Sequence, residues 1–293
     1  MTSYDGVDLV RGVSALAPRY AGFILDQWGV LHDGTRPYAG AAECLQRLRG
    51  EGRRIVVLSN SGKREAENLR VMASMGFDVR LLDRCVCAGE EARRAIETRA
   101  DAFHGVLGRR CYAFTRGGDR AVLEGIGLEF VERVEDAEFL AVLGIDSPQR
   151  SLADYEDELV AGVRRTLPMV CANPDIARLT PQGLVDAQGV LAVRYQALGG
   201  RVFYHGKPYP AIYRSCLAAL ACPPEKVLMV GDSVDHDVLG ASRAGIASAL
   251  IPGAVHGPEL GVAYGELPDE NRWRAFAAKA SSQPEYLLAA FNW

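Results

Sequence analysis

The 293-residue sequence contains no apolar run that approaches the about 20 residues needed for a membrane-spanning helix. Its segment Leu9–Ala17 is interrupted by Arg11 and lacks the basic start of a signal peptide. An excess of positive charge is also missing, because the formal net charge is −4. These absences argue against a membrane protein and against a binder of long nucleic-acid polymers, and they lead us to expect a cytoplasmic location.

Two common nucleotide-binding signatures are absent as well. The sequence has no Gly-x-x-x-x-Gly-Lys-Ser/Thr phosphate loop. The segment Gly125-Ile126-Gly127 lacks the third glycine of a dinucleotide-binding fingerprint. The sequence therefore predicts neither an ATPase nor a dehydrogenase.

The seven cysteines are odd in number and scattered through apolar segments, which favours reduced thiols over a disulfide framework. Cys85-Val86-Cys87 has a spacing of a single residue and no second ligand pair, so we interpret both cysteines as buried strand positions. No zinc site is predicted.

Short apolar runs alternate with amphipathic helical patterns along most of the chain. This alternation is typical of an α/β fold, in which helices connect the strands of a parallel sheet. The predicted strands of a Rossmann-like core are 21–25, 54–58, 201–205, 227–231 and 247–251. The predicted helices that follow them are Ala39–Arg49, Arg64–Met75, Pro210–Ala221 and Asp235–Ala244, the last ending at Gly245.

The same alternation is repeated between the second and third of these core strands. There we expect strands at 110–114, 138–143 and 168–172, with helices near 89–99, 118–125, 152–166 and 187–198. The sequence thus predicts a core domain of residues 1–80 and 202–293, and an inserted α/β domain of residues 81–201. A domain inserted beside an active site is suited to act as a lid or cap. The tail, residues 269–293, is expected to be helical with a break near Pro284.

Polar residues that are candidates for catalysis or ligand binding follow four of the predicted strands. Asp26 follows Phe23-Ile24-Leu25, Ser59 follows Ile55-Val56-Val57-Leu58, Lys207 follows Val202-Phe203-Tyr204, and Asp232 follows Val227-Leu228-Met229-Val230. In open parallel sheets, ligands bind beyond the carboxyl ends of the strands, so we expect these side chains to meet. The oxygen ligands of Asp26 and Asp232 suit Mg²⁺ better than zinc.

In this order, the four blocks resemble the haloacid dehalogenase superfamily. Ala172-Asn173-Pro174-Asp175 and Gly206-Lys207-Pro208 extend the resemblance to the capped class IIA branch, which includes nucleotide and sugar phosphatases. The resemblance covers most of residues 20–255. One position departs from it, because Trp28 stands where those phosphatases usually carry a second Asp that acts as general acid and base.

The resemblance implies an Mg²⁺-dependent phosphatase that hydrolyses a small phosphorylated metabolite through an aspartyl-phosphate on Asp26. It adds the backbone carbonyl of Trp28 as a metal ligand, and it favours Asp237 over Asp235 as the residue that holds a metal-bound water or orients Lys207. The residues themselves leave another interpretation open, in which Ser233, Asp235 and Asp237 form the acidic first turn of a helix.

Phosphate binding is predicted for Ser59, Asn60 and Lys207, with backbone N–H groups at the entry to the next helix. Ser59 is also suited to cap the helix 64–75. The resemblance makes the segment after the last strand of the insert a candidate for substrate recognition, with Asn173, Asp175 and Arg178 as its contacts. A plain Asn/Pro turn is the alternative there.

An indole can neither protonate a leaving group nor activate water, and the sequence leaves three accounts of Trp28 open. His32 or Asp33 replaces the missing acid and base, the substrate carries a good leaving group, or the protein is a phosphate-binding or sensor protein with little turnover. A homodimer also stays open at this stage.

Overall fold

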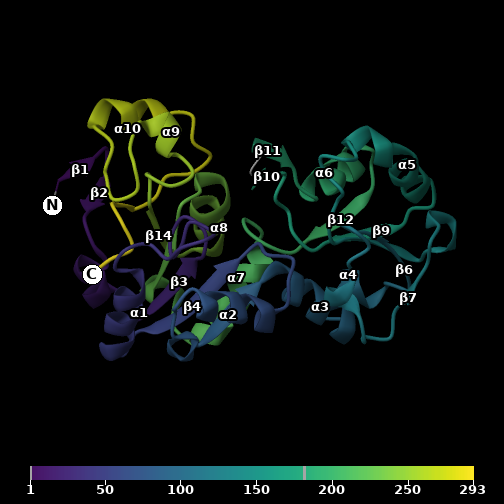
Figure 1. Cartoon of the computed structure of the whole chain (residues 1–293), viewed down its shortest axis with the longest axis horizontal. Helices are drawn as coiled ribbons and strands as arrows, with labels where there is room; N and C mark the ends of the chain where they lie inside the picture. The colour runs from purple at the N-terminus through teal and green to yellow at the C-terminus, as the bar shows by residue number, and fades with distance from the viewer. Residues whose placement is uncertain (1, 181–182) are drawn as a thin grey trace. The chain divides into compact units, whose positions relative to one another are not determined.

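The computed structural model describes residues 2–180 and 183–293, and the chain divides into two compact units. Unit 1 comprises Met1–Ser59, Ala66–Val86 and Lys207–Trp293, so both ends of the chain belong to it (Figure 1). Unit 2 comprises Asn60–Glu65 and Cys87–Gly206. Within the described residues, no helix combines the length and the apolar character needed to cross a lipid bilayer.

Unit 1 is built on an eight-stranded sheet with the order β1-β2-β15-β14-β13-β3-β4-β5. All neighbouring pairs from β2 to β4 are parallel, and β1 pairs antiparallel with β2. In sheet order, the strands are β1 (Ser3–Tyr4), β2 (Val7–Val10), β15 (Tyr286–Leu288), β14 (Ala247–Leu250), β13 (Val227–Gly231), β3 (Gly22–Asp26), β4 (Arg54–Ser59) and β5 (Arg84–Cys87).

The helices of this unit follow its strands, as the alternating pattern predicts, except α7 (Pro210–Leu220), which follows a strand of unit 2. They are α1 (Ala41–Gly50), α2 (Glu65–Ser74), α7 (Pro210–Leu220), the π-helical turn η8 (Val234–Val238), α8 (Leu239–Ala244), α9 (Gly257–Leu260) and α10 (Glu270–Ala277). Short 3-10 turns occupy Val13–Ala15, Ala17–Arg19, Val79–Leu81 and Pro224–Lys226. Helix α8 ends at Gly245, whose φ of 69° is a backbone conformation that glycine adopts without strain.

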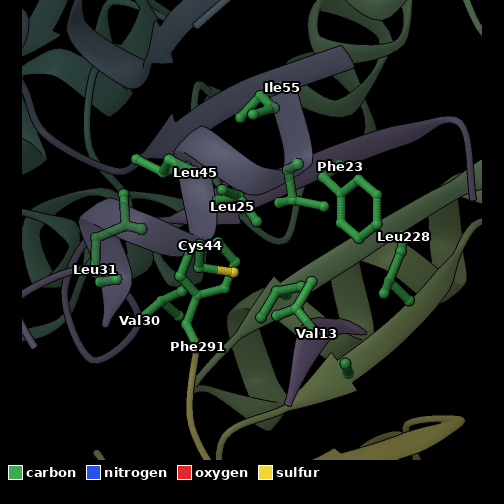
Figure 2. Close-up of a cluster of buried hydrophobic side chains, with 14 of the residues drawn as sticks. Val13, Phe23, Leu25, Val30, Leu31, Cys44, Leu45, Ile55, Leu228 and Phe291 are labelled. Atoms are coloured by element: carbon green, nitrogen blue, oxygen red, sulfur yellow. The ribbon is translucent and has the colours of Figure 1, made fainter. Parts of the chain in front are cut away.

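The apolar runs of the sequence become the core of unit 1 because their side chains are removed from water. All five residues of β3 and all five of β13 are buried. Helix α1 turns one face inward, since its buried residues recur at helical spacing: Ala41, Cys44, Leu45 and Leu48. Figure 2 shows part of this cluster, including Phe23, Leu25 and Leu228. Each fully buried side chain of this size stabilises the fold by about 1.5–3 kcal/mol relative to exposure.

Unit 2 contains a five-stranded sheet with the order β12-β9-β8-β6-β7, in which every pair is parallel. The strands are β12 (Arg201–Tyr204), β9 (Pro168–Cys171), β8 (Phe139–Val142), β6 (Arg110–Phe114) and β7 (Glu129–Phe130). An antiparallel pair, β10 (Ala177–Thr180) and β11 (Gly183–Asp186), stands apart from this sheet. The helices are α3 (Ala88–Thr98), α4 (Ala102–Gly105), α5 (Glu156–Arg164) and α6 (Gly189–Ala197), with 3-10 turns at Ala121–Leu123, Val134–Asp136 and Leu152–Tyr155.

The parallel-sheet α/β architecture is confirmed, but several predicted elements are wrong. The strand predicted at 201–205 does not join the core sheet, because β12 pairs with β9 in register from Arg201↔Pro168 to Tyr204↔Cys171. Conversely, β5 lies within the predicted insert 81–201 but belongs to the larger sheet. The helix expected at 118–125 is only the turn Ala121–Leu123. The tail is helical only in part, since its buried residues Tyr286–Leu288 form a strand between β2 and β14.

A pair of histidines is buried inside unit 2, next to its C-terminal end. His104 Nδ1 lies 2.9 Å from Asp101 Oδ1, and His104 Nε2 lies 3.1 Å from His205 Nε2. One of the two facing nitrogens must donate and the other must accept, so the contact requires that one of them carry no proton. Burial, together with the neighbouring His104, lowers the pKa of His205 to about 3.

This pair should make unit 2 sensitive to acid. Because the pKa of an unfolded histidine is about 6.5, the unfolded chain binds more protons than the folded one between that pH and about pH 3. The contribution of neutral His205 to the free energy of unfolding is therefore fully present above about pH 6.5. Below that pH, the free energy of unfolding falls by about 1 kcal/mol per pH unit. Urea unfolding from pH 7.5 to pH 4.5 measures it. His205→Gln should flatten the pH dependence; an unchanged slope in that variant would contradict the assignment.

Candidate active site

The polar residues at the ends of three neighbouring strands of unit 1 lie at one edge of its sheet. Asp26 ends β3, Ser59 ends β4, and Asp232 follows β13, and these strands are adjacent and parallel in the order β13-β3-β4. Ser59 and Asp26 are both buried. The sheet therefore brings the carboxyl ends of these strands together, as expected for a site beyond the ends of parallel strands.

Lys207 connects two carboxylates at this edge. Its Nζ atom lies 2.7 Å from Asp26 Oδ1 and 2.7 Å from Asp237 Oδ1, and all three side chains are buried. Burial alone would lower the pKa of Lys207, but Asp237 and Asp26 raise it above its ordinary value. Lys207 is therefore a fixed positive charge between the two carboxylates.

Asp237 shapes the loop that carries Asp232. Its Oδ2 atom accepts the backbone N–H groups of Asp232 at 3.2 Å and of Ser233 at 3.1 Å. The π-helical turn η8 directs Asp237 inward, whereas Asp235 accepts a hydrogen bond from Ser281 Oγ at 2.6 Å. Of the two aspartates that the sequence offered, the structure thus brings Asp237 to Asp26.

Three carboxylates form a compact cluster here. One oxygen atom from each of Asp26, Asp232 and Asp237 lies within 4.8 Å of the other two. Burial raises the pKa of Asp26 to about 7, with Asp237 adding to the effect and Lys207 opposing it. Burial also raises the pKa of Asp232, with Asp26 and Asp237 adding to the effect and Lys207 opposing it. Three carboxylates that share one lysine have a surplus of negative charge, and their hard oxygen atoms fit a Mg²⁺ ion.

The backbone after Trp28 passes directly beside Asp232. Gly29 has a φ of +74°, and a Cβ atom at this position would lie 2.0 Å from Asp232 Oδ2. Only glycine permits so close an approach of this peptide to the carboxylate. The sequence analysis did not single out Gly29, although a glycine directly after a candidate metal ligand was the available signal. The Trp28 carbonyl as a metal ligand stays a prediction.

The loop after Trp28 contains the two residues that were candidates for the missing acid and base. His32 is buried, its Nδ1 atom accepts the N–H of Gly34 at 3.0 Å, and burial lowers its pKa. Asp33 Oδ1 accepts the N–H groups of Thr35 and Arg36 at 2.8 and 2.7 Å, and these bonds, with the Thr35 hydroxyl, lower its pKa to about 2. Both side chains hold the loop in shape, and a role for them in proton transfer stays a prediction.

The indole of Trp28 is an exposed part of the same loop. The residue is 57% exposed, and its ring packs edge to face with His32 at a centroid distance of 5.6 Å. A Cβ atom at Gly34 would lie 2.2 Å from the indole Cζ3 atom, so the ring rests against the backbone there. The indole is therefore held in place while much of its surface faces solvent.

The remaining candidates lie in unit 2. Asn60 Nδ2 donates to Asp175 Oδ1 at 2.7 Å, and the N–H of Asp175 donates to Asn173 Oδ1 at 2.8 Å. Arg178 is engaged elsewhere, since its guanidinium donates to the Ser147 carbonyl oxygen at 2.6 Å. The structure thus joins Asn60, Asn173 and Asp175 in one cluster. Sequence reasoning missed the link between Asn60 and Asp175 because no local pattern connects residues this far apart.

Comparisons with known proteins agree with this arrangement. A model described as haloacid dehalogenase-like hydrolase matches residues 23–129, and a second, described as HAD-hydrolase-like, matches residues 204–270. The 5'-nucleotidase YutF of Bacillus subtilis is 27% identical over 79% of this chain and 87% of its own. The D-glycerol 3-phosphate phosphatase of Mycobacterium tuberculosis is 24% identical over 94% of this chain and 71% of its own.

A solved structure gives the strongest of these matches. It is the crystal structure of a hydrolase of the haloacid dehalogenase-like family from Brucella suis 1330. Its TM-score with this chain is 0.78 at 30% identity, and the match covers 96% of this chain and 99% of that one. The chain therefore belongs to the haloacid dehalogenase-like hydrolase family.

Proposed function

We propose that this protein is an Mg²⁺-dependent phosphatase that hydrolyses a small phosphorylated metabolite of the sugar phosphate or nucleotide class. The observation that carries the proposal is the buried cluster in which Lys207 joins Asp26 to Asp237, with Asp232 beside them. The similarity to a nucleotidase and to a glycerol 3-phosphate phosphatase supports the same reaction class.

Asp26 is the proposed nucleophile. A carboxylate oxygen of Asp26 attacks the phosphorus atom, the bond from phosphorus to the ester oxygen breaks, and the leaving group departs with the electron pair. Water then attacks the aspartyl-phosphate, which releases inorganic phosphate and restores the carboxylate. Lys207, 2.7 Å from Asp26 Oδ1, holds this side chain in place and offsets part of the negative charge of the incoming phosphate.

Asp26, Asp232 and Asp237 are the proposed holders of the metal, Asp237 through a water molecule, with the Trp28 carbonyl as a further ligand. Bound there, Mg²⁺ would supply positive charge that lowers the repulsion between the carboxylates and the phosphate. Ser59, which ends β4, and Asn60, which follows it, are the proposed partners of the phosphate oxygens together with Lys207.

Unit 2 is the proposed cap, and recognition of the substrate is assigned to it because the site in unit 1 offers only general contacts to phosphate and metal. Asn173, Asp175 and Arg178 are the proposed substrate contacts. The first two are held by the hydrogen bonds that link them to each other and to Asn60. A cytoplasmic location and a homodimer stay predictions.

Release of phosphate from a broad panel of phosphorylated metabolites tests the proposal. We expect turnover with Mg²⁺ and its loss with a chelator, because the carboxylate cluster needs a cation to admit a phosphate. Asp232→Asn should weaken the response to Mg²⁺. Asp235→Asn is the matched control, since Asp235 bonds to Ser281 and is not part of the cluster.

One outcome would favour the alternative function. If no member of the panel is hydrolysed while phosphate still binds in an Mg²⁺-dependent manner, the protein is a phosphate-binding or sensor protein on this fold. The observation that keeps this alternative in view is Trp28, whose indole cannot transfer the proton that phosphate ester hydrolysis usually requires.

A further inference from the structure

Trp28 lies close to the proposed nucleophile and is solvent-exposed. Two residues of chain span at most about 7 Å, so the backbone of Trp28 stays near that of Asp26. The other end of the loop is fixed as well, because Gly29 packs against Asp232. The backbone of residue 28 therefore adjoins the carboxylate cluster, within reach of a substrate that Asp26 attacks.

Most large apolar residues of the chain are buried in a core, but Trp28 is exposed. Trp273 is 1% exposed, whereas Trp28 is 57% exposed and Val255 is 58% exposed. Both exposed residues flank the same carboxylate, since Trp28 precedes Gly29 and the N–H of Val255 donates to Asp232 Oδ2 at 3.3 Å. The carboxylate cluster thus has an apolar border whose exposure a role in the core does not explain.

We propose that the indole of Trp28 is a stacking surface for the substrate, and that the protein prefers phosphate esters whose ester oxygen is bonded to a planar, conjugated group, namely aryl and enol phosphates. This inference rests on the proposed phosphatase activity, and it names aryl and enol phosphates as the preferred substrates in place of the sugar phosphate or nucleotide class. The indole is suited to this task because Gly34 and His32 already hold it, so little side-chain freedom is lost when a ring stacks on it.

The hydrogen bonds of His32 and Asp33 favour the same class of substrate, because they determine whether either side chain can donate a proton. The Nδ1 lone pair of His32 is used by the Gly34 N–H, so the neutral ring carries its proton on Nε2 and has no free nitrogen to take up another. Asp33 accepts three hydrogen bonds at Oδ1 that favour its ionised form. Neither side chain is poised to donate a proton to a departing oxygen.

Because neither side chain is poised to donate a proton, the substrate should carry a leaving group that departs without an acid. When Asp26 attacks phosphorus, the electron pair of the ester bond leaves on the substrate oxygen. An aryl oxide or enolate spreads this charge over its conjugated system and takes a proton from solvent afterwards, whereas an alkoxide must be protonated as it leaves. The group that spreads charge is also planar, which is the shape that stacks on an indole.

Steady-state kinetics on two phosphate esters and one acyl phosphate tests the inference. 1-Naphthyl phosphate has a planar ring and a good leaving group, acetyl phosphate has a good leaving group without a ring, and glycerol 3-phosphate has neither. Trp28→Leu should raise the ratio of KM for naphthyl phosphate to KM for acetyl phosphate by about tenfold, in the range of ring stacking. Trp28→Phe, which keeps a smaller ring, should recover part of the loss. Equal changes for naphthyl and acetyl phosphate would overturn the inference.

Fluorescence provides a readout that does not require turnover. In an Asp26→Asn background, phenyl phosphate should quench the emission of the exposed Trp28, and inorganic phosphate should not; the signal should vanish when Trp28→Phe is added. If inorganic phosphate binds and phenyl phosphate binds no more tightly, the stacking inference fails and the proposed function stands. If neither ligand binds to the unsubstituted protein with Mg²⁺ present, the proposed function fails and the inference fails with it.

Discussion

Asp26→Asn should reduce phosphate release by on the order of 10⁵-fold, the scale on which loss of a covalent nucleophile acts. The amide keeps the size of the side chain but is a far weaker nucleophile, and it removes one anionic ligand from the carboxylate cluster. The fold should survive, since the change removes a buried negative charge that lies near Asp232 and Asp237. Phosphate release and the urea midpoint, measured on the same preparation, test both parts.

Asp235→Asn is the matched control for this experiment. It makes the same chemical change in the turn η8, two residues before Asp237, but its carboxylate bonds to Ser281 and is not part of the cluster. Its turnover should stay within about twofold of the native value, as for a surface substitution away from the chemistry. A near-native kcat in Asp26→Asn would rule out the covalent mechanism, whatever the control shows.

The parts of the fold that the sequence predicts well are those with a local signal. Phe23-Ile24-Leu25 and Val227–Val230 are continuous apolar runs, and both become fully buried neighbouring strands with a carboxylate at or just after their ends. No local sequence pattern indicates which other strand a given strand pairs with. β12 and β15 are short apolar runs like the others, and only the three-dimensional pairing assigns β12 to the sheet of unit 2 and β15 to that of unit 1.

In the site, the sequence indicates which residues lie close together but not where their side chains point or what they bond to. The sequence places Asp235 and Asp237 on one turn, but the choice between them depends on the π-helical geometry of η8, which directs Asp237 toward Lys207. It also names His32 and Asp33 as candidate acids without indicating that the loop backbone occupies both of their side chains. Hydrogen bonds within a closed loop are set by its dihedral angles, which residue types do not specify.

Trp28→Asp should extend the reaction to esters with poor leaving groups. A carboxyl group at this position supplies the missing proton donor, and general acid catalysis is typically worth about 10²–10⁴-fold, so glycerol 3-phosphate turnover should rise by about 10²-fold. The negative charge of Asp26 and Asp232 favours the protonated form that this proton transfer requires, since residue 28 lies two positions after Asp26 and directly before Gly29, which packs against Asp232. Naphthyl phosphate should gain little and lose its stacking surface.

Trp28→Asn separates proton transfer from the removal of the indole, since an amide has nearly the same shape as the carboxyl group but cannot act as the acid. A gain for Trp28→Asp that Trp28→Asn does not share therefore measures acid catalysis. If a loop residue already performs this task, Trp28→Asp should gain little, and His32→Ala or Asp33→Asn should lose about 10²-fold or more, most strongly for glycerol 3-phosphate. The hydrogen bonds of His32 and Asp33 favour the opposite result. Replacing either residue should then loosen the loop and slow the hydrolysis of naphthyl phosphate, acetyl phosphate and glycerol 3-phosphate equally.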